Sequence, residues 1–225
     1  MDHDDITDSK DLHKNYATYG ASSEYSNPQS HKYLLTIPRA VQACQEVETS
    51  IASLLDHGTG NGGLPSILNA ALPTLKVAGY DPAVKIFSQT INQKYDIVTS
   101  IDVLEHISKS EIQKTLDEIH DATNKFFFFC IDLIPAIKQT SDGRNAHFLI
   151  APSDWWTAQL KNKFNIVTTI EVGELESGTK YPLRLFGCAT DSMKHFKTMN
   201  TFLENVGIAQ KRWVWTSTGV ILKEY

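Results

Sequence analysis

The chain has 225 residues, of which 41% are hydrophobic and 21% charged, so it can form one globular domain with additions and a sizeable core. Its net charge of −5 argues against a protein that follows the phosphate backbone of a nucleic acid, and no apolar stretch is long enough to span a membrane. Three scattered cysteines, Cys44, Cys130 and Cys188, indicate buried thiols in a reducing compartment. Because the first residues are also unlike a signal peptide, we expect a cytoplasmic protein.

Residues 1–50 are predicted to form an N-terminal flap followed by a helix. The polar segment 1–36 carries four tyrosines, which are many for a segment with nothing to pack against. They are Tyr16, Tyr19, Tyr25 and Tyr33. Aromatic side chains supply a large contact area, so we expect this segment to close over a ligand, with Tyr19 at the substrate; a passive tail is the alternative. Pro38 then suits the first turn of the helix.

The segment Ile51–Gly63 carries the strongest local pattern of the chain. An apolar run ends at Asp56, and four glycines follow within six positions. They are Gly58, Gly60, Gly62 and Gly63. Glycine lets the backbone approach a ligand closely, and Pro65 suits the start of a helix, so the pattern predicts a strand, a turn and a helix whose N–H groups face a nucleotide-type ligand. The spacing fits both the dinucleotide fingerprint and the S-adenosylmethionine form.

A second acidic position follows about twenty residues later, where such folds commonly bind ribose. Leu75–Asp81 is a short apolar strand that ends in a carboxylate, and a carboxylate can accept hydrogen bonds from two adjacent hydroxyls. The alternative is that Asp81 and Pro82 simply open a turn; we favour ribose binding because of the strand and the glycine loop before it.

The next strand, Ile97–Val103, begins soon after Asp81. In between, Val84, Phe87 and Ile91 have the spacing of one face of a helix. We expect no room for the further strand that a full doubly wound sheet would carry here. The usual source of an adenine contact is therefore missing.

Polar side chains cluster where this strand ends, at the edge where open α/β sheets bind ligands. They are Asp102, Glu105 and His106. Ser108 and Glu111 then fit a capping box at the start of a helix.

Lys125–Ile131, with four consecutive phenylalanines, predicts a central strand buried on both faces, and Asp132 ends it. We take His147, His106 and Asp132 as candidate general bases, and we favour His147 because it follows a polar turn rather than lying on an apolar face. Glu105, His106 and His147 match no spacing of metal ligands, so we expect no metal site.

The last third of the chain predicts a helix capped by Ser153. Trp156, Leu160 and Phe164 recur on its core-facing side, whereas Trp155 is rotated off that side and is predicted to contact the substrate.

Two strands are expected to follow, at Asn165–Val172 and Pro182–Ala189, joined by a polar loop. A helix is predicted from Ser192 to Gly207. Trp213 and Trp215 alternate with polar residues, which indicates an edge strand or an interface strand.

Three motifs together resemble the class I S-adenosylmethionine-dependent methyltransferases that carry D-V-L-E-H after the fourth strand. The motifs are L-D-H-G-T-G-N-G-G at 55–63, G-Y-D-P at 79–82 and S-I-D-V-L-E-H-I at 100–107. The resemblance covers about residues 50–172. It implies an α/β fold, a Rossmann-like doubly wound sheet that is mostly parallel with an antiparallel last strand, and helices on both faces.

The resemblance also implies S-adenosylmethionine as the cofactor. By analogy, the residues around the cofactor are Asp56, Gly58, Thr59, Gly60, Gly62, Asp81, Pro82 and Asp102. The cofactor domain would span 51–190, with a C-terminal helix and strand extension at 191–225. Electrostatics favours the same cofactor over a nicotinamide: Asp56 would repel a pyrophosphate at a helix start, whereas it attracts the ammonium and sulfonium groups of S-adenosylmethionine.

The predicted function is methyl transfer to a small polar acceptor, with O-methylation of a sugar or a sugar-bearing metabolite favoured. The alternatives are a non-catalytic S-adenosylmethionine-binding regulatory module and, less favoured, an NAD(P)-dependent oxidoreductase. We expect a monomer or homodimer without nucleic-acid or membrane partners.

Overall fold

The computed structural model describes residues 34–137, 139–140, 142–176, 179–206, 214–216 and 219–221. The strands are β1 (Ser53–His57), β2 (Lys76–Tyr80), β3 (Tyr95–Ile101), β4 (Thr123–Asp132), β5 (Ile166–Glu176), β6 (Thr179–Thr190), β7 (Val214–Thr216) and β8 (Gly219–Ile221). The helices are α2 (Ile37–Val47), α3 (Gly63–Ala71), α4 (Ile112–Ala122), α5 (Ser153–Lys161) and α6 (Phe196–Asn205), with short 3₁₀ helices η2 (Leu34–Thr36), η3 (Leu104–His106) and η4 (Met193–His195).

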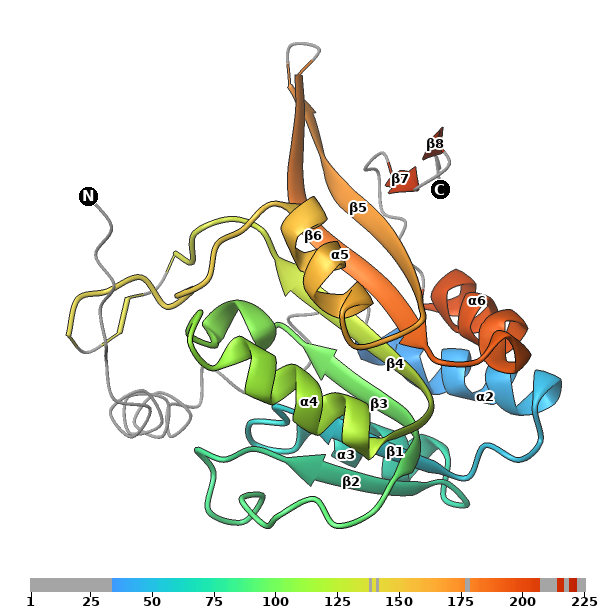
Figure 1. Ribbon diagram of the computed structural model, residues 1–225. Helices are drawn as coiled ribbons and strands as arrows, with labels where there is room; N and C mark the ends of the chain where they lie inside the picture. Colours follow the sequence, from blue (N-terminus) through green and yellow to red (C-terminus); the bar gives the residue numbers. More distant parts are fainter. Residues whose placement is uncertain are drawn as a thin grey trace.

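The strands form one mixed sheet in the order β2-β1-β3-β4-β6-β5-β7-β8 (Figure 1). The pairs β1–β2, β1–β3 and β3–β4 are parallel, whereas β6 runs antiparallel to both β4 and β5. This confirms the predicted α/β class, with a parallel half that carries the glycine motif and an antiparallel strand beyond β4. The carboxyl ends of β1 to β4 therefore meet at one edge of the sheet.

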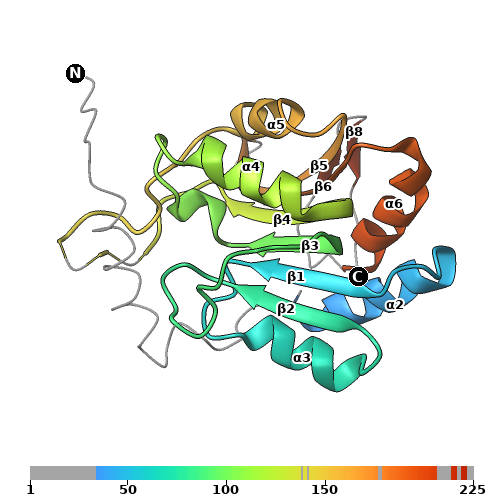
Figure 2. The ribbon, with the colours of Figure 1, turned by 60° about the horizontal axis from the view of Figure 1, so that its bottom comes forward.

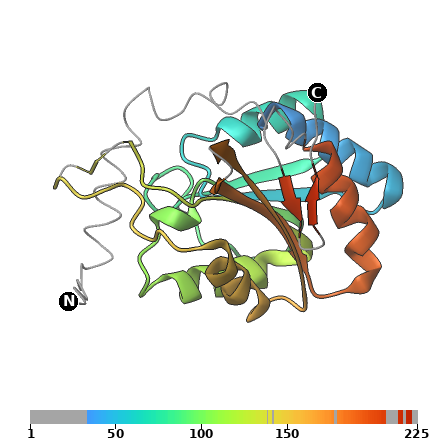
Figure 3. The same ribbon diagram turned by 90° about the horizontal axis from the view of Figure 1, so that it is seen from above.

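Helices cover both faces of the sheet, as expected. α4 and α5 lie on one face, and α2 and α3 lie on the other (Figures 2 and 3). Strand β4 serves both layers because successive side chains of a strand point to opposite faces. Phe126 and Phe128 pack with the α2, α3 and α6 layer, while Phe127 and Phe129 pack with the α4 and α5 layer. All four are fully buried, so the prediction of a central strand is confirmed.

The predicted helix through Val84, Phe87 and Ile91 is wrong, because residues 81–94 form turns and bends. The N–H of Asp81 donates to the carbonyl of Phe87, and the N–H of Phe87 donates to the carbonyl of Val84. These bonds close a compact loop and leave its backbone groups unavailable to a helix. Among the described residues, the chain enters β3 with no further strand after β2, as the early arrival of Ile97 predicted.

The two predicted caps also differ from the structure. Helix α4 begins at Ile112, and the Ser108 hydroxyl donates to the Glu111 carboxylate instead of accepting from the backbone. Ser153 is the first residue of α5, and its hydroxyl donates to Glu171 on β5. In both cases the serine hydroxyl donates to a glutamate carboxylate and does not cap the helix backbone.

The C-terminal extension adds to the same sheet. β7 pairs with β5 on one side and with β8 on the other, so the strand that contains Trp215 is not an edge strand, and the predicted alternative of an interface strand stays a prediction. Trp213 and Gly207 lie outside the described residues. No helix in the described part of the chain is both long and apolar enough to cross a bilayer.

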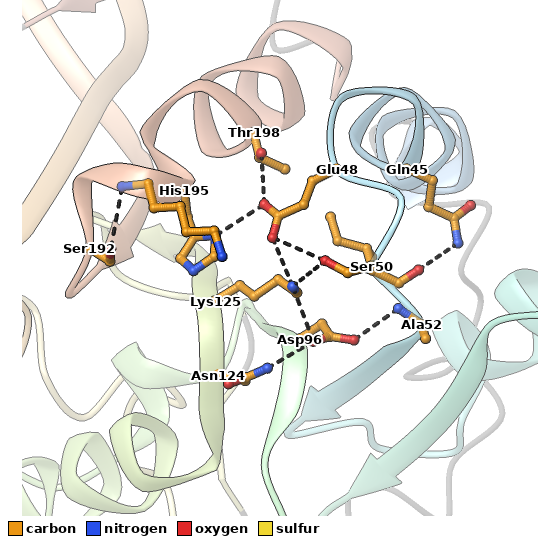
Figure 4. Close-up of polar contacts among 12 residues, drawn as sticks. Gln45, Glu48, Ser50, Ala52, Asp96, Asn124, Lys125, Ser192, His195 and Thr198 are labelled. Carbon is orange, nitrogen blue, oxygen red and sulfur yellow. Dashed lines mark hydrogen bonds and ion pairs between the residues drawn. The ribbon is translucent and has the colours of Figure 1, made fainter.

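An ionic network ties the layers together at the amino ends of the strands (Figure 4). Glu48, which follows α2, accepts hydrogen bonds from Lys125 of β4 at 2.7 Å and from Thr198 of α6 at 3.0 Å, and it contacts His195 Nδ1 at 3.0 Å. Although burial opposes its ionisation, these hydrogen bonds lower the pKa of Glu48 to about 2. The network lies at the edge of the sheet opposite to the carboxyl ends of the parallel strands, where the candidate functional site is found.

Candidate functional site

The glycine segment forms a tight loop between β1 and α3. Gly58, Gly60 and Gly62 have φ of 79°, 55° and 78°, in the left-handed region that favours glycine. The N–H groups of Gly58 and Thr59 both donate to the carbonyl of Tyr80, at 2.7 and 3.0 Å. The loop is thereby fastened to the end of β2, and the helix α3 starts directly behind it.

The positions of two glycines leave no space for a side chain. A Cβ at Gly58 would lie 2.4 Å from a methyl carbon of Val103, and one at Gly62 would lie 2.6 Å from the ring of Phe87. At Gly60 nothing lies within 4 Å of the same position. The neighbouring side chains therefore require glycine at 58 and 62, while the Cβ position of Gly60 faces open space.

Asp81 joins the loop to the turn after β2. Its Oδ2 accepts from the N–H of Gly60 and its Oδ1 from the N–H of Ala83, both at 2.9 Å. The turn through Pro82 that we considered as the alternative is thus present. It is compatible with ribose binding, because each carboxylate oxygen accepts more than one hydrogen bond.

Asp56 ends β1 as a buried carboxylate, with 5% of its surface exposed. Its Oδ1 accepts from the hydroxyl of Thr99 on the neighbouring strand, at 2.8 Å. Burial raises the pKa of Asp56 to about 6. A positively charged ligand group beside this carboxylate would favour its ionised form.

Beyond β3 and β4 lies a second polar group, tied together by Arg184 of β6. Asp102 has a positive φ of 54°, and both of its oxygens accept from Arg184 Nη1, at 3.2 and 3.3 Å. The same guanidinium contacts Asp132, with 2.7 Å between Nε and Oδ1. Arg184 was not predicted. The only indication in the sequence is a charged residue within the otherwise apolar run L-R-L-F of β6, and this run matches no functional motif.

Glu105, His106 and His147 lie beside the ion pairs of Arg184. Glu105 is fully buried, and its Oε1 accepts from the N–H of Asp132 at 3.0 Å. The rings of His106 and His147 stand edge to face, 4.8 Å apart, and His147 Nε2 lies 4.0 Å from Asp132 Oδ2. Burial raises the pKa of Glu105 well above its ordinary range, with the charges of Asp102 and Asp132 adding to it. Burial also lowers the pKa of His106 to about 4.

Comparison with known proteins decides the family. The family described as "Methyltransferase domain" matches residues 25–158, more than half of the chain. The chain belongs to this methyltransferase family. With the glycine motif, Asp56 and the D-V-L-E-H segment in place, it is a class I S-adenosylmethionine-dependent methyltransferase. No curated protein sequence matches it.

Solved structures share the fold at low sequence identity. The 1,6-didemethyltoxoflavin-N1-methyltransferase from Burkholderia thailandensis is 12% identical with a TM-score of 0.50, over 80% of this chain and 88% of that one. The methyltransferase domain of a bacterial CtHen1-C is 15% identical with a TM-score of 0.49, over 70% of this chain and all of that one. An O-methyltransferase family protein from B. thailandensis is 12% identical with a TM-score of 0.44, over 69% of this chain. The methyltransferase spans 56% of the length of that last protein.

The methyltransferase fold brings the predicted site residues into two adjoining groups. Hydrogen bonds and strand pairing join the cofactor candidates of β1 and β2 around the glycine loop, and Asp102 follows the neighbouring β3. His106, His147 and Asp132 form the second group. Trp155 stands edge-on to Trp156 with 5.0 Å between ring centroids, and its contact with substrate stays a prediction. Tyr19 lies outside the described residues.

Proposed function

We propose that this methyltransferase transfers the methyl group of S-adenosylmethionine to a hydroxyl oxygen of a small polar acceptor, such as a sugar or a sugar-bearing metabolite. The observation that supports it is the group of His106, His147 and Asp132 beyond the carboxyl ends of β3 and β4. A hydroxyl must lose its proton when it is methylated, whereas many nitrogen and thiolate acceptors need no such help. A cluster of side chains that can accept a proton is what an enzyme needs to methylate a hydroxyl.

The cofactor would lie over the carboxyl ends of β1, β2 and β3. The start of α3 and the loop backbone would face its charged methionine end, and the buried carboxylate of Asp56 would pair with its ammonium group. Asp81 would accept hydrogen bonds from the ribose hydroxyls while it holds Gly60 in place. When bound, the cofactor supplies an electrophilic methyl group on a sulfonium.

Methyl transfer forms the oxygen–carbon bond and breaks the carbon–sulfur bond, and the electron pair of the broken bond remains on the sulfur. The protein must hold the acceptor oxygen, the methyl carbon and the sulfur in line, which can contribute about 7–11 kcal/mol to lowering the barrier. His147 is the residue through which we expect the hydroxyl to be activated. Its Nδ1 donates to the carbonyl of Ile134 at 2.6 Å, so the neutral ring carries its lone pair on Nε2, beside Asp132.

The test is an acceptor screen that measures S-adenosylhomocysteine. We expect its formation with hydroxyl acceptors, such as monosaccharides and glycosides, and not with amines or thiols of similar size. His147→Ala should lower turnover by about 10²–10⁴-fold and leave cofactor affinity nearly intact in calorimetry. The matched control is His120→Ala, because His120 is partly exposed and pairs with Asp191. Methylation of amines or thiols alone, or a fully active His147→Ala enzyme, would overturn the proposal.

A further inference from the structure

The side chains of Glu105, His106 and His147 converge on one point from two separate parts of the chain. His106 and Glu105 belong to η3, after β3, and His147 lies in the connection between β4 and α5. One carboxylate oxygen and one nitrogen of each ring all lie within 4.8 Å of one another. Metal ions bind to sets of this composition, two imidazoles and one carboxylate.

Both histidines are held in the tautomer that a metal ligand needs. Nδ1 of His106 lies 2.7 Å from the carbonyl of Ala146, and Nδ1 of His147 lies 2.6 Å from the carbonyl of Ile134. A carbonyl oxygen only accepts, so Nδ1 carries the hydrogen in each ring, and in the neutral imidazole the lone pair is then on Nε2. Backbone carbonyls that receive Nδ1–H are the usual second shell of metal-binding histidines, because they fix both the tautomer and the ring orientation.

Glu105 provides an independent indication of a cation. Its side chain is fully buried, and its Oε1 is occupied by the N–H of Asp132. Its Oε2 is also buried, and it has no hydrogen-bond partner among the described residues. An unpartnered carboxylate oxygen in a protein interior is costly unless an ion or a proton compensates it.

We propose that Glu105, His106 and His147 bind a divalent first-row transition ion, such as Mn²⁺, Co²⁺ or Zn²⁺. Two imidazole nitrogens favour these ions over Mg²⁺ and Ca²⁺, which prefer oxygen ligands. Three protein ligands leave at least one coordination position open, as catalytic metal sites do. Asp102 and Asp132 approach Glu105 within 4.8 Å and add negative charge around the ion, which Arg184 partly offsets.

The role of the ion in the reaction rests on the proposed function, whereas the binding of the ion does not. The acceptor hydroxyl would bind at the open position, where a divalent charge lowers the pKa of the hydroxyl. Its proton leaves to the Asp132 carboxylate and then to solvent. The oxygen lone pair forms the bond to the methyl carbon, and the electron pair of the carbon–sulfur bond stays on sulfur, giving neutral S-adenosylhomocysteine. His147 then acts as an ion ligand and not as the base.

Binding of the ion alone tests the site without reference to activity. After treatment with a chelator, the full-length protein is titrated with Co²⁺ and followed by visible absorbance, and Zn²⁺, Mn²⁺ and Mg²⁺ are compared by calorimetry. We expect one Co²⁺ per chain with a ligand-field band. His106→Ala, His147→Ala and Glu105→Gln should each weaken binding by more than about 100-fold, since even outer-shell changes cost 10–100-fold. His120→Ala should bind as the wild type does.

Glu105→Gln keeps the shape of the side chain and the acceptor for Asp132 N–H, so it guards against loss by misfolding; melting curves of all variants complete that control. Equal Co²⁺ affinity in the wild type and in folded Glu105→Gln and His147→Ala proteins would overturn the site. Full activity of the chelator-treated enzyme on a hydroxyl acceptor would overturn the role of the ion and leave the proposed function standing. Specific Co²⁺ binding without any hydroxyl methylation would instead refute the proposed function and confirm the site.

Discussion

Gly58→Ala is expected to destabilise the methyltransferase more than Gly60→Ala, although both glycines have positive φ. A side chain in this backbone region costs about 1–2 kcal/mol at either position. At Gly58 the new Cβ would also lie 2.4 and 2.5 Å from the two methyl carbons of Val103, whereas at Gly60 it meets nothing within 4 Å. Overpacking adds about 1–3 kcal/mol. We therefore expect losses of about 2–5 kcal/mol for Gly58→Ala and about 1–2 kcal/mol for Gly60→Ala.

Urea unfolding of the purified variants measures these losses. Gly143→Ala is the reference for the backbone cost alone, because Gly143 has φ 84°, lies outside the glycine loop and has nothing within 4 Å of an added Cβ. The double variant Gly58→Ala/Val103→Ala removes the two methyl carbons nearest the new Cβ and leaves only the Cβ of residue 103, at 3.0 Å, so a cycle with the two single variants should show a coupling of about 1–3 kcal/mol. Equal losses for Gly58→Ala and Gly60→Ala, without coupling to Val103, would refute the reasoning that packing against Val103 requires this glycine.

Three further substitutions test the charged groups. Asp81→Ala should weaken S-adenosylmethionine and S-adenosylhomocysteine by about 1–3 kcal/mol in calorimetry, through loss of ribose hydrogen bonds and of the support to Gly60; unchanged affinity would remove Asp81 from the site. Asp56→Asn should stabilise the ligand-free protein at pH 7 by about 1–3 kcal/mol while weakening cofactor binding, because burial raises the pKa of Asp56 in the folded protein to about 6. This gain in stability should fade as the pH drops from 6 towards 4, where the carboxyl becomes protonated in the folded protein. A gain that is constant with pH would argue against this cause. Glu48→Gln should destabilise the protein by about 1–3 kcal/mol at neutral pH, because hydrogen bonds lower the pKa of Glu48 in the folded protein to about 2. In urea unfolding, the difference in stability between wild type and variant should shrink as the pH falls below the ordinary pKa of a glutamate. An equal difference at pH 7 and pH 3 would contradict this prediction.

Local patterns in the sequence were sufficient to predict the parallel half of the fold and the glycine loop between β1 and α3. The acid and glycines after β1 had to be close in sequence, because a strand, a tight turn and a helix start are consecutive segments of chain. The phenylalanine run of β4 showed burial on both faces for the same local reason, since alternation along one strand serves both layers. The helix predicted around Phe87 failed because bonds that close the loop at Asp81 outweigh the weak signal of three apolar residues.

Long-range pairing decided the second half of the site, and no local pattern could have shown it. Arg184 reaches Asp102 across 82 residues and Asp132 across 52, because β6 inserts antiparallel beside β4. His106 meets Ala146 across 40 residues, which brings His147 to Glu105 although their spacing fits no ligand motif. The sequence by itself determined the family, the glycine loop and most of the strands, because short chain segments encode them. Only the tertiary structure decided which polar side chains face one another at the carboxyl edge, because sheet order and connection length set those distances.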